Sequence, residues 1–376
     1  MIYIGYLSLF LFATFLDFET KQRELKRAVQ IILVTISICF IGLRYYTGAD
    51  WSGYINYFNT VTWENTKYQV GYKILNILCK MIVDDYHLVQ FISTTIFVIS
   101  VVSFFNKYSK YPFLCLFLCI VFYFDSLLMA QVRQSLAISV LLLGSNYLFE
   151  KRLLRWSIVV FLASLFHFTA MIALSFPLLR IQLTKKTRFL LCLLPIAIWI
   201  VPQILFEILE IISCVPGKIG SIVVHYLNSN RFNKGVELST GLVFFSRLLF
   251  SIFIILFYSP KSTNENIFLN SLLVSTILKS CMIVFTMFGR LESYFGLYAI
   301  IGWIYFFEIK IIKKEKQLFC IPLFLFLLFF LLPFAKARLS TGISQLTGRS
   351  SQYQYIPYYN VFLHPADANH RKDWNE

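Results

Sequence analysis

The sequence predicts an all-α protein, a polytopic integral membrane bundle of about ten to eleven transmembrane helices that forms one domain over residues 1–376. Three observations predict it. Hydrophobic residues make up 58% of the 376 residues and charged residues 14%, whereas soluble domains have about 45–50% apolar and about 25% charged residues. Apolar stretches long enough to cross a bilayer recur along the chain, and basic residues gather in a few connections between them. This composition excludes a soluble globule, a disordered protein and a nucleic-acid-binding module.

The charge and the cysteines agree with this class of protein. The 34 Lys and Arg residues exceed the 19 Asp and Glu residues, for a formal net charge of +15. Such an excess is expected of a membrane protein, because basic residues mark cytoplasmic loops and face anionic lipid. The eight cysteines lie mostly in apolar runs without a CxxC pair, which indicates neither a disulfide framework nor a zinc site. We therefore predict no metal and no cofactor.

Eleven apolar stretches are candidate spans. The first lacks a basic n-region and a small-residue cleavage site, so we interpret it as a retained span. The candidates are residues 1–17, 28–45, 88–105, 111–128, 131–149, 156–180, 188–206, 240–258, 266–288, 290–309 and 317–335.

Basic connections set the orientation. Residues 21–27 and 310–316 each carry four Lys or Arg residues and are predicted to be cytoplasmic. An even number of crossings must separate them, yet nine stretches lie between. Stretch 156–180 is basic at both ends, so we interpret it as a re-entrant hairpin with His167 near its tip. Alternatively, 156–180 is a true span and the missing crossing lies in 204–226, which its charged residues disfavour.

With the hairpin, both chain ends face outward. The long outward segments are 46–87, 207–239 and the tail 336–376, and all are aromatic and polar. Long loops on a rigid helical frame are where binding and catalytic groups collect.

The first candidate site follows the second span. Residues 42–58 contain Arg44, then Asp50 and Trp51 between two glycines, which indicates a tight outward turn. In one interpretation Arg44 and the aromatic residues are interfacial anchors. In the other, Arg44 binds an anion and Asp50 is a base or a sugar contact.

Two further sites lie within apolar helices. Arg133 and Gln134 begin one such helix, where a guanidinium must be paired or face a wet cavity. The alternative is that Arg133 snorkels to the interface. His167 lies in an apolar segment with no metal-ligand spacing around it, and it is either a hydrogen-bonded structural residue or a general base or phosphate donor.

Arginines and tyrosines also mark the later part of the chain. Arg290 and Tyr294 share a helical face at i,i+4, with Glu292 pointing elsewhere. The outward segments add Arg231, Tyr355 and Tyr358, and aromatic residues interleaved with amides suit stacking on sugar rings. An interfacial belt has the same pattern. Several arginines at the ends of apolar helices favour recognition of a diphosphate carried on a membrane lipid, because Arg binds phosphate bidentately.

Five ordered motifs carry a resemblance to a known family. They are LRYYTGADWSGYINYF at 43–58, GYKILN at 71–76, QVRQSLAISVLLLG at 131–144, ASLFHFTAMIAL at 163–174 and GRLESYF at 289–295, followed by the late segment YIPY at 355–358. In this order they resemble the EpsG family of Wzy-type exopolysaccharide and O-antigen polymerases. The match spans most of the chain. One departure is Gln69, which stands where the family often carries an acid.

The resemblance implies a membrane glycosyltransferase that joins oligosaccharide repeat units borne on undecaprenyl diphosphate into exopolysaccharide, capsule or O-antigen. It implies a multi-pass protein of the bacterial inner membrane, with the flippase and chain-length regulator of the same pathway as partners. By position it points to catalytic roles for Asp50, Arg133, His167 and Arg290. The substrate-binding candidates are Arg44, Gln134, Arg231, Tyr294, Tyr355 and Tyr358. A lipid-linked oligosaccharide flippase or a membrane O-acyltransferase are the alternative functions.

Overall fold

The structure is a computed structural model of the chain. It describes residues 2–19, 22–48, 50–64, 67–201, 203–214, 216–227, 238–282, 285, 287–309 and 358–362. These residues fall into two units. Unit 1 contains Met1–Leu174 and Leu325–Glu376, and unit 2 contains Ser175–Phe324.

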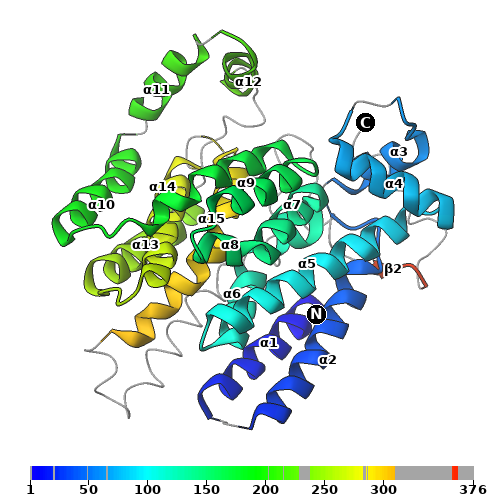
Figure 1. The fold of residues 1–376 in the computed structure, drawn as a ribbon, viewed down its shortest axis with the longest axis horizontal. Helices are drawn as coiled ribbons and strands as arrows, with labels where there is room; N and C mark the ends of the chain where they lie inside the picture. Colours follow the sequence, from blue (N-terminus) through cyan, green and yellow to red (C-terminus); the bar gives the residue numbers. More distant parts are fainter. Residues whose placement is uncertain are drawn as a thin grey trace. The chain divides into compact units, whose positions relative to one another are not determined.

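Unit 1 is built from helices and one short strand pair (Figure 1). α1 packs on α6, α2 packs on α5, and α5 also contacts α4, α6 and α7. The elements are α1 (Ile2–Glu19), α2 (Arg23–Gly42), β1 (Arg44–Tyr45), α3 (Trp51–Thr60), α4 (Val70–Ile82), α5 (Tyr86–Tyr108), α6 (Pro112–Tyr123), the π-helix η1 (Phe124–Ala130), α7 (Val132–Leu143), α8 (Ser145–Phe149), α9 (Leu153–Ser164) and β2 (Tyr359–Asn360). The 3-10 helix η2 (Phe168–Arg180) begins in unit 1 and ends in unit 2.

Unit 2 is a second set of helices, in which α14 packs along α15 and both α10 and α13 pack on α14. Its remaining elements are α10 (Lys185–Ile200), α11 (Gln203–Ser213), α12 (Lys218–Leu227), α13 (Leu238–Phe257), α14 (Thr263–Cys281), α15 (Phe288–Ile304) and η3 (Tyr305–Glu308). The guanidinium of Arg188 in α10 donates to the carbonyl of Tyr258 at 2.8 Å. This bond ties the start of α10 to the end of α13.

Local sequence explains where the central helices of unit 1 begin. Pro112 occupies the first turn of α6, where its missing N–H costs nothing. Asp17 of α1 accepts the Leu114 backbone N–H at 3.0 Å and so caps α6 from a neighbouring helix. Asp85 caps α5 by accepting the His87 N–H at 2.9 Å. α6 is apolar on all sides and is almost wholly buried, as expected for such a helix.

The predicted fold class is confirmed: the chain is a helical membrane bundle. Among the described residues, α2, α5 and the continuous stretch Pro112–Ala130 are long and apolar enough to cross a membrane as single helices. A fourth crossing would be α10 with α11, a pair bent by 91°. The count of ten to eleven spans stays a prediction, and the predicted span 317–335 lies outside the described residues.

Stretch 156–180 is a hairpin. It contains α9, a turn at residues 165–167, and η2. The Trp156 indole N–H donates to the carbonyl of Ala173 at 2.9 Å, so the chain after the turn runs back along α9. α9 has 12 residues, whereas a crossing needs about 20. This geometry agrees with the predicted re-entrant segment, and the placement of its ends on the cytoplasmic side stays a prediction.

In the alternative topology the missing crossing lies in residues 204–226, and this stretch contains two short helices. α11 has 11 residues and α12 has 10, and Gly217 between them has φ +98°. Neither helix reaches the length of a crossing. The choice between the hairpin and the alternative topology stays a prediction.

Residues 46–87 were predicted to be a long outward loop. In the structure this segment contains two helices, α3 and α4. α4 buries one face, with Tyr72, Asn76 and Cys79 at helical spacing. These helices enclose an aromatic cluster that contains Tyr54, Tyr57 and Tyr72.

Candidate functional site

Arg133 lies where a wide helical turn meets a regular helix. The π-helix η1 ends at Ala130, and Arg133 is the second residue of α7. A π-helical turn widens the backbone and is frequent at functional sites. Here it brings the start of α7 to the aromatic cluster, because Val132 and Leu136 of α7 pack into that cluster.

The Arg133 side chain rests on an aromatic ring. Its guanidinium carbon lies 3.9 Å from the centre of the Tyr68 ring, a cation–π contact. Its Nη1 donates to Oε1 of Gln69 at 3.0 Å, and its Nε is buried without a hydrogen-bond partner among the described residues. Gln69 is neutral, so this contact orients the guanidinium without neutralising its charge. A half-buried cation held in this way can bind an anion.

Tyrosines surround this arginine. The Tyr57 and Tyr68 rings lie 4.4 Å apart and the Tyr54 and Tyr72 rings 5.6 Å apart. Burial raises the pKa of Tyr54 to about 12, and the nearby positive charge of Arg133 opposes that rise. The pKa of Tyr68 is also raised, by burial first, with the same opposition from Arg133. Both tyrosines are therefore uncharged near neutral pH. They offer hydroxyl donors and flat ring faces.

Asp50 belongs to the same site. It precedes α3, and its negative charge acts on both Tyr54 and Tyr68 in the direction opposite to that of Arg133. The carboxyl group is half-buried. An acid and an arginine thus act on the same two tyrosines of the cluster.

The tip of the α9–η2 hairpin contacts this cluster. The backbone N–H of Gly71 at the start of α4 donates to the carbonyl of Leu165 at 2.8 Å. A Cβ at position 71 would lie only 2.8 Å from that oxygen, so glycine permits the approach. Phe166 packs against the cluster, and His167 is the next residue. The Nδ1 of His167 lies 2.5 Å from the Thr169 hydroxyl.

Arg44 is bound by carbonyls. It is 1% exposed, and it donates from Nη1 to Ile41 at 2.6 Å, from Nη2 to Met129 at 2.9 Å and from Nε to Thr47 at 3.1 Å. These contacts close the end of α2 and join it to the last turn of η1. They indicate a structural role, and binding of substrate by Arg44 stays a prediction.

The turn after Arg44 packs tightly against the Met129 carbonyl. Gly48 has φ +111°, and a Cβ there would lie 2.4 Å from the Met129 carbonyl oxygen. Gln90 donates to the carbonyls of Gly42 and Arg44 at 2.8 and 2.9 Å and accepts from the Trp51 indole at 3.0 Å. Residues 44–48 and Trp51 are therefore held against α5 and η1.

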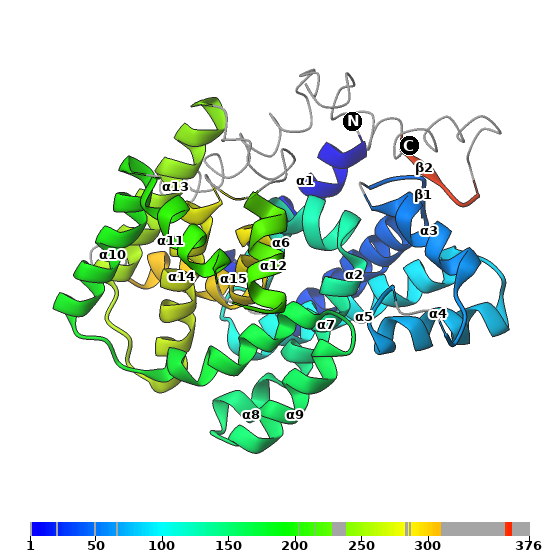
Figure 2. The same ribbon diagram turned by 90° about the horizontal axis from the view of Figure 1, so that it is seen from above.

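The tail strand β2 pairs antiparallel with β1 (Figure 2). Tyr358 stacks on Phe40 with ring centres 4.6 Å apart and donates to the Phe40 carbonyl at 2.6 Å. Its hydroxyl thus holds the tail to α2, and sugar binding by Tyr358 stays a prediction. Gln134 is buried on α7. The predicted residues Arg231 and Tyr355 lie outside the described residues.

The structure places Arg290 and Tyr294 in unit 2, at the beginning of α15. Arg290 is half-buried, and Tyr294 is 1% exposed. The structure thus brings Asp50, Arg133 and the hairpin tip together in unit 1. The predicted roles of Arg290 and Tyr294 stay predictions.

Tyr68 and Lys279 were not among the residues that the sequence singled out, and the contacts of Gln69 and Glu292 were not foreseen. Tyr68 and Gln69 orient Arg133, and no spacing rule connects residues that far apart in the chain. In unit 2, Lys279 pairs with Glu292 at 3.2 Å. A signal for this pair was present, because ionisable residues inside apolar helices are functional candidates by default.

The fold and this site define a class: an integral membrane protein with an arginine and an acid around a tyrosine cluster in its predicted outward segment. A family model described as the EpsG family matches residues 27–360. The chain belongs to the EpsG family, a family of Wzy-like polymerases. It is thus a polysaccharide-polymerase-like membrane protein. No curated protein and no solved structure matches the chain.

Proposed function

We propose that this protein is a glycosyltransferase that joins oligosaccharide repeat units carried on undecaprenyl diphosphate into an exopolysaccharide, capsule or O-antigen chain. It works on the outer side of the bacterial cytoplasmic membrane. The observation that carries the proposal is Arg133, a cation held over Tyr68 and beside Gln69 with an Nε donor free of any described partner. Membership of the EpsG family supports the same reaction class.

The reaction transfers a sugar from one lipid to another. The bond between the reducing-end sugar of the growing chain and its lipid diphosphate breaks, and a hydroxyl of the incoming lipid-linked unit bonds to the same sugar carbon. The bonding electrons leave with the diphosphate, and the hydroxyl proton passes to a base.

Arg133 stabilises the negative charge that develops on the departing diphosphate. A guanidinium oriented in advance, in a site with little water, stabilises such charge better than water does. Arg290 is a second candidate for binding a diphosphate. Because both lipid tails lie in the plane of the membrane, the two substrates meet at high effective concentration.

Asp50 and His167 are the two candidates for the base. Asp50 acts on Tyr54 and Tyr68 of the cluster, whereas His167 follows the hairpin tip that contacts it.

The decisive experiment supplies the purified protein, in nanodiscs, with the undecaprenyl-diphosphate repeat unit of its host and no nucleotide sugar. We expect a ladder of polymer on a gel. The absence of a ladder, together with movement of the intact unit across a vesicle membrane, would identify a flippase instead. In cells, we expect this protein to associate with the flippase and the chain-length regulator of the same pathway. Co-purification tests this association.

A further inference from the structure

Helix α4 has an exposed face that is entirely apolar. The structure describes every residue of this helix, and its exposed residues recur at helical spacing and form one stripe: Val70, Ile74, Leu78, Met81 and Ile82. Their exposed fractions range from 38% to 78%. We call these five residues the α4 stripe. In water the stripe would be a contiguous apolar patch of a kind that usually marks an interaction surface.

The polar groups of α4 point away from the stripe. Asn76 is buried. Lys73 donates to the Trp63 carbonyl at 2.8 Å. Lys80 donates to the Asn59 carbonyl near the end of α3 at 3.0 Å. The two cations therefore tie α4 to the residues before it, and the helix turns its polar groups inward and its apolar groups outward.

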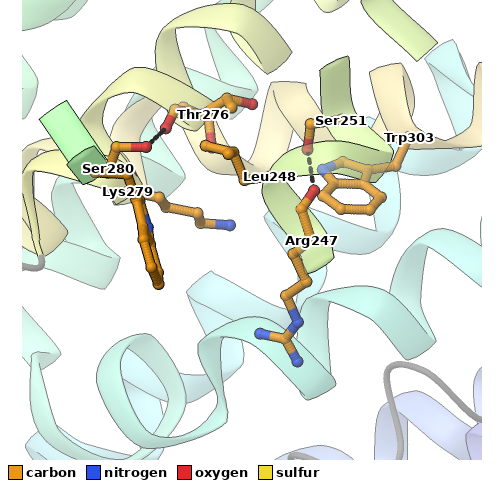
Figure 3. A pocket seen from close by; sticks show the side chains of 9 residues that line it. Arg247, Leu248, Ser251, Thr276, Lys279, Ser280 and Trp303 are labelled. Carbon is orange, nitrogen blue, oxygen red and sulfur yellow. Dashed lines mark hydrogen bonds between the residues drawn. The ribbon is translucent and has the colours of Figure 1, made fainter. Parts of the chain in front are cut away.

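The interior of unit 2 has the same distribution of polarity. Lys279 of α14 pairs with the buried carboxylate of Glu292 of α15 at 3.2 Å. Figure 3 shows Lys279 and Arg247 on neighbouring helices, with Ser251 donating to the Arg247 carbonyl at 2.9 Å. Membrane proteins turn polar groups inward in this way because lipid offers them no partner. α4 shares this polarity although it lies outside the predicted spans.

The length and the neighbours of α4 indicate what covers the stripe. α4 has 13 residues, about 20 Å of helix, whereas a crossing needs about 20 residues. It lies between α2 and α5, which are both long and apolar enough to cross a membrane. Tyr72 and Cys79 of α4 share one cluster with Tyr86 and Val89 at the beginning of α5. The bilayer around α5 is therefore the apolar medium nearest to the stripe.

Exposed apolar residues continue beyond α4. The Gly71 N–H donates to the carbonyl of Leu165 in the α9–η2 hairpin. Phe161 and Phe168 on either side of this tip are 59% and 66% exposed. Exposed apolar side chains therefore occur on both segments that meet at Gly71. A bilayer covers both segments, and this continuity favours lipid over a single docked protein.

We propose that α4 lies along the membrane–water interface and that the partner of the α4 stripe is the lipid bilayer. An amphipathic helix in this plane buries its apolar face about 5–10 Å into the boundary between headgroups and acyl chains. The stripe begins directly after Gln69, which binds Arg133. Arg133 thereby lies close to the level of the headgroups, where a membrane lipid carries its diphosphate. Only this last consequence rests on the proposed function.

The test measures the depth of spin labels on the full-length protein in nanodiscs of phosphatidylcholine and phosphatidylglycerol. With the native cysteines replaced, a nitroxide is attached at Ile74→Cys or Leu78→Cys. Its collisions with oxygen, which concentrates in lipid, are compared with its collisions with a polar nickel chelate, which stays in water. We expect both labels to lie about 5–10 Å below the headgroup boundary.

Two further labels calibrate the measurement. Asn56→Cys, at an exposed polar position of α3, is the matched control and should collide mainly with the nickel chelate. Ile32→Cys, at an exposed position of α2, is the reference for lipid. All four positions are exposed, so the labels leave the buried faces intact, and thermal unfolding checks each protein. A fluorophore at 74 or 78 should also be quenched by lipids brominated on their acyl chains, and one at 56 should not.

The collision rates distinguish the possible surroundings of the stripe. Ready collision with the nickel chelate at 74 and 78 places the stripe in water and overturns the proposal. Shielding from both reagents also overturns it, because a second copy of this chain or another protein then covers the stripe. The depth is measured without substrate, so a missing ladder in the polymerase assay contradicts the proposed function and leaves this result as it stands.

Discussion

Arg133 shows how one side chain acquires a role from its neighbours. Its guanidinium is stacked on Tyr68 and hydrogen-bonded to Gln69, both on the segment that leads into α4. The amide of Gln69 orients the cation and leaves its charge available. Arg44 is the contrast, because carbonyls accept from three of its nitrogens. Two arginines that look equivalent in sequence therefore differ in the donors that a substrate can reach.

The first prediction concerns Arg133. Arg133→Gln is expected to lower the rate of polymer formation by about 10²–10³-fold, the usual effect of removing one donor to a developing charge. Arg133→Lys should also be poor, because a point charge does not reproduce the fork. The ladder assay measures both. Arg152→Gln, at an exposed arginine of unit 1, should keep its activity, and full activity of both Arg133 variants would remove this residue from the mechanism.

The second prediction uses a matched pair of glycines. Gly71→Ala places a methyl group against the Leu165 carbonyl and should lower the free energy of unfolding by about 1–3 kcal/mol. A Cβ at Gly53 in α3 meets nothing within 4 Å, so Gly53→Ala should be neutral or stabilising. Thermal unfolding in detergent compares the two. Equal stability of the variants would mean that α4 does not dock on the hairpin tip.

A third prediction concerns pH. The pKa of Tyr54 is about 12 in the folded protein and about 10 in an unfolded chain. The unfolded chain therefore releases this proton first, and the stability from Tyr54 is complete below pH 10 and lost as the pH rises toward 12. Tyr54→Phe should make the loss of unfolding free energy over that interval shallower. Tyr147→Phe, on α8 away from the cluster, should leave the slope as it is.

At the scale of elements, three irregular pieces build the site. The π-helix η1 sets the start of α7, the α9–η2 hairpin brings Leu165 and Phe166 to the cluster, and β2 ties the tail to β1 beside Arg44. Apolar stretches of spanning length indicated the long helices, and charge indicated the hairpin. Neither the apolar stretches nor the charge pattern could indicate η1 or the β1–β2 pair, because both depend on contacts between distant parts of the chain.

The fourth prediction tests the hairpin. With the native cysteines replaced, Lys151→Cys and Lys186→Cys flank the hairpin at exposed positions, and Lys67→Cys is an exposed position of the predicted outward segment. A membrane-impermeant thiol reagent applied to intact cells should label only the cysteine at 67, and the other two should be labelled after permeabilisation. Labelling of 151 and 186 from opposite sides would make 156–180 a true crossing.

For the whole molecule, composition, apolar stretches and basic connections were enough to predict a helical membrane bundle, because a bilayer forces every backbone amide to bond within its own segment. Arg133 and His167 were also recognisable as candidates, because polar groups in apolar helices are costly. Asp50 was recognisable from its place in a glycine turn of the predicted outward segment. Their grouping around tyrosines and the position of Arg44 among carbonyls were decided by tertiary structure alone. The contacts of Arg133 with Gln69 and of Arg44 with Met129 join residues far apart in the chain, and no local pattern encodes which side chains packing will bring together.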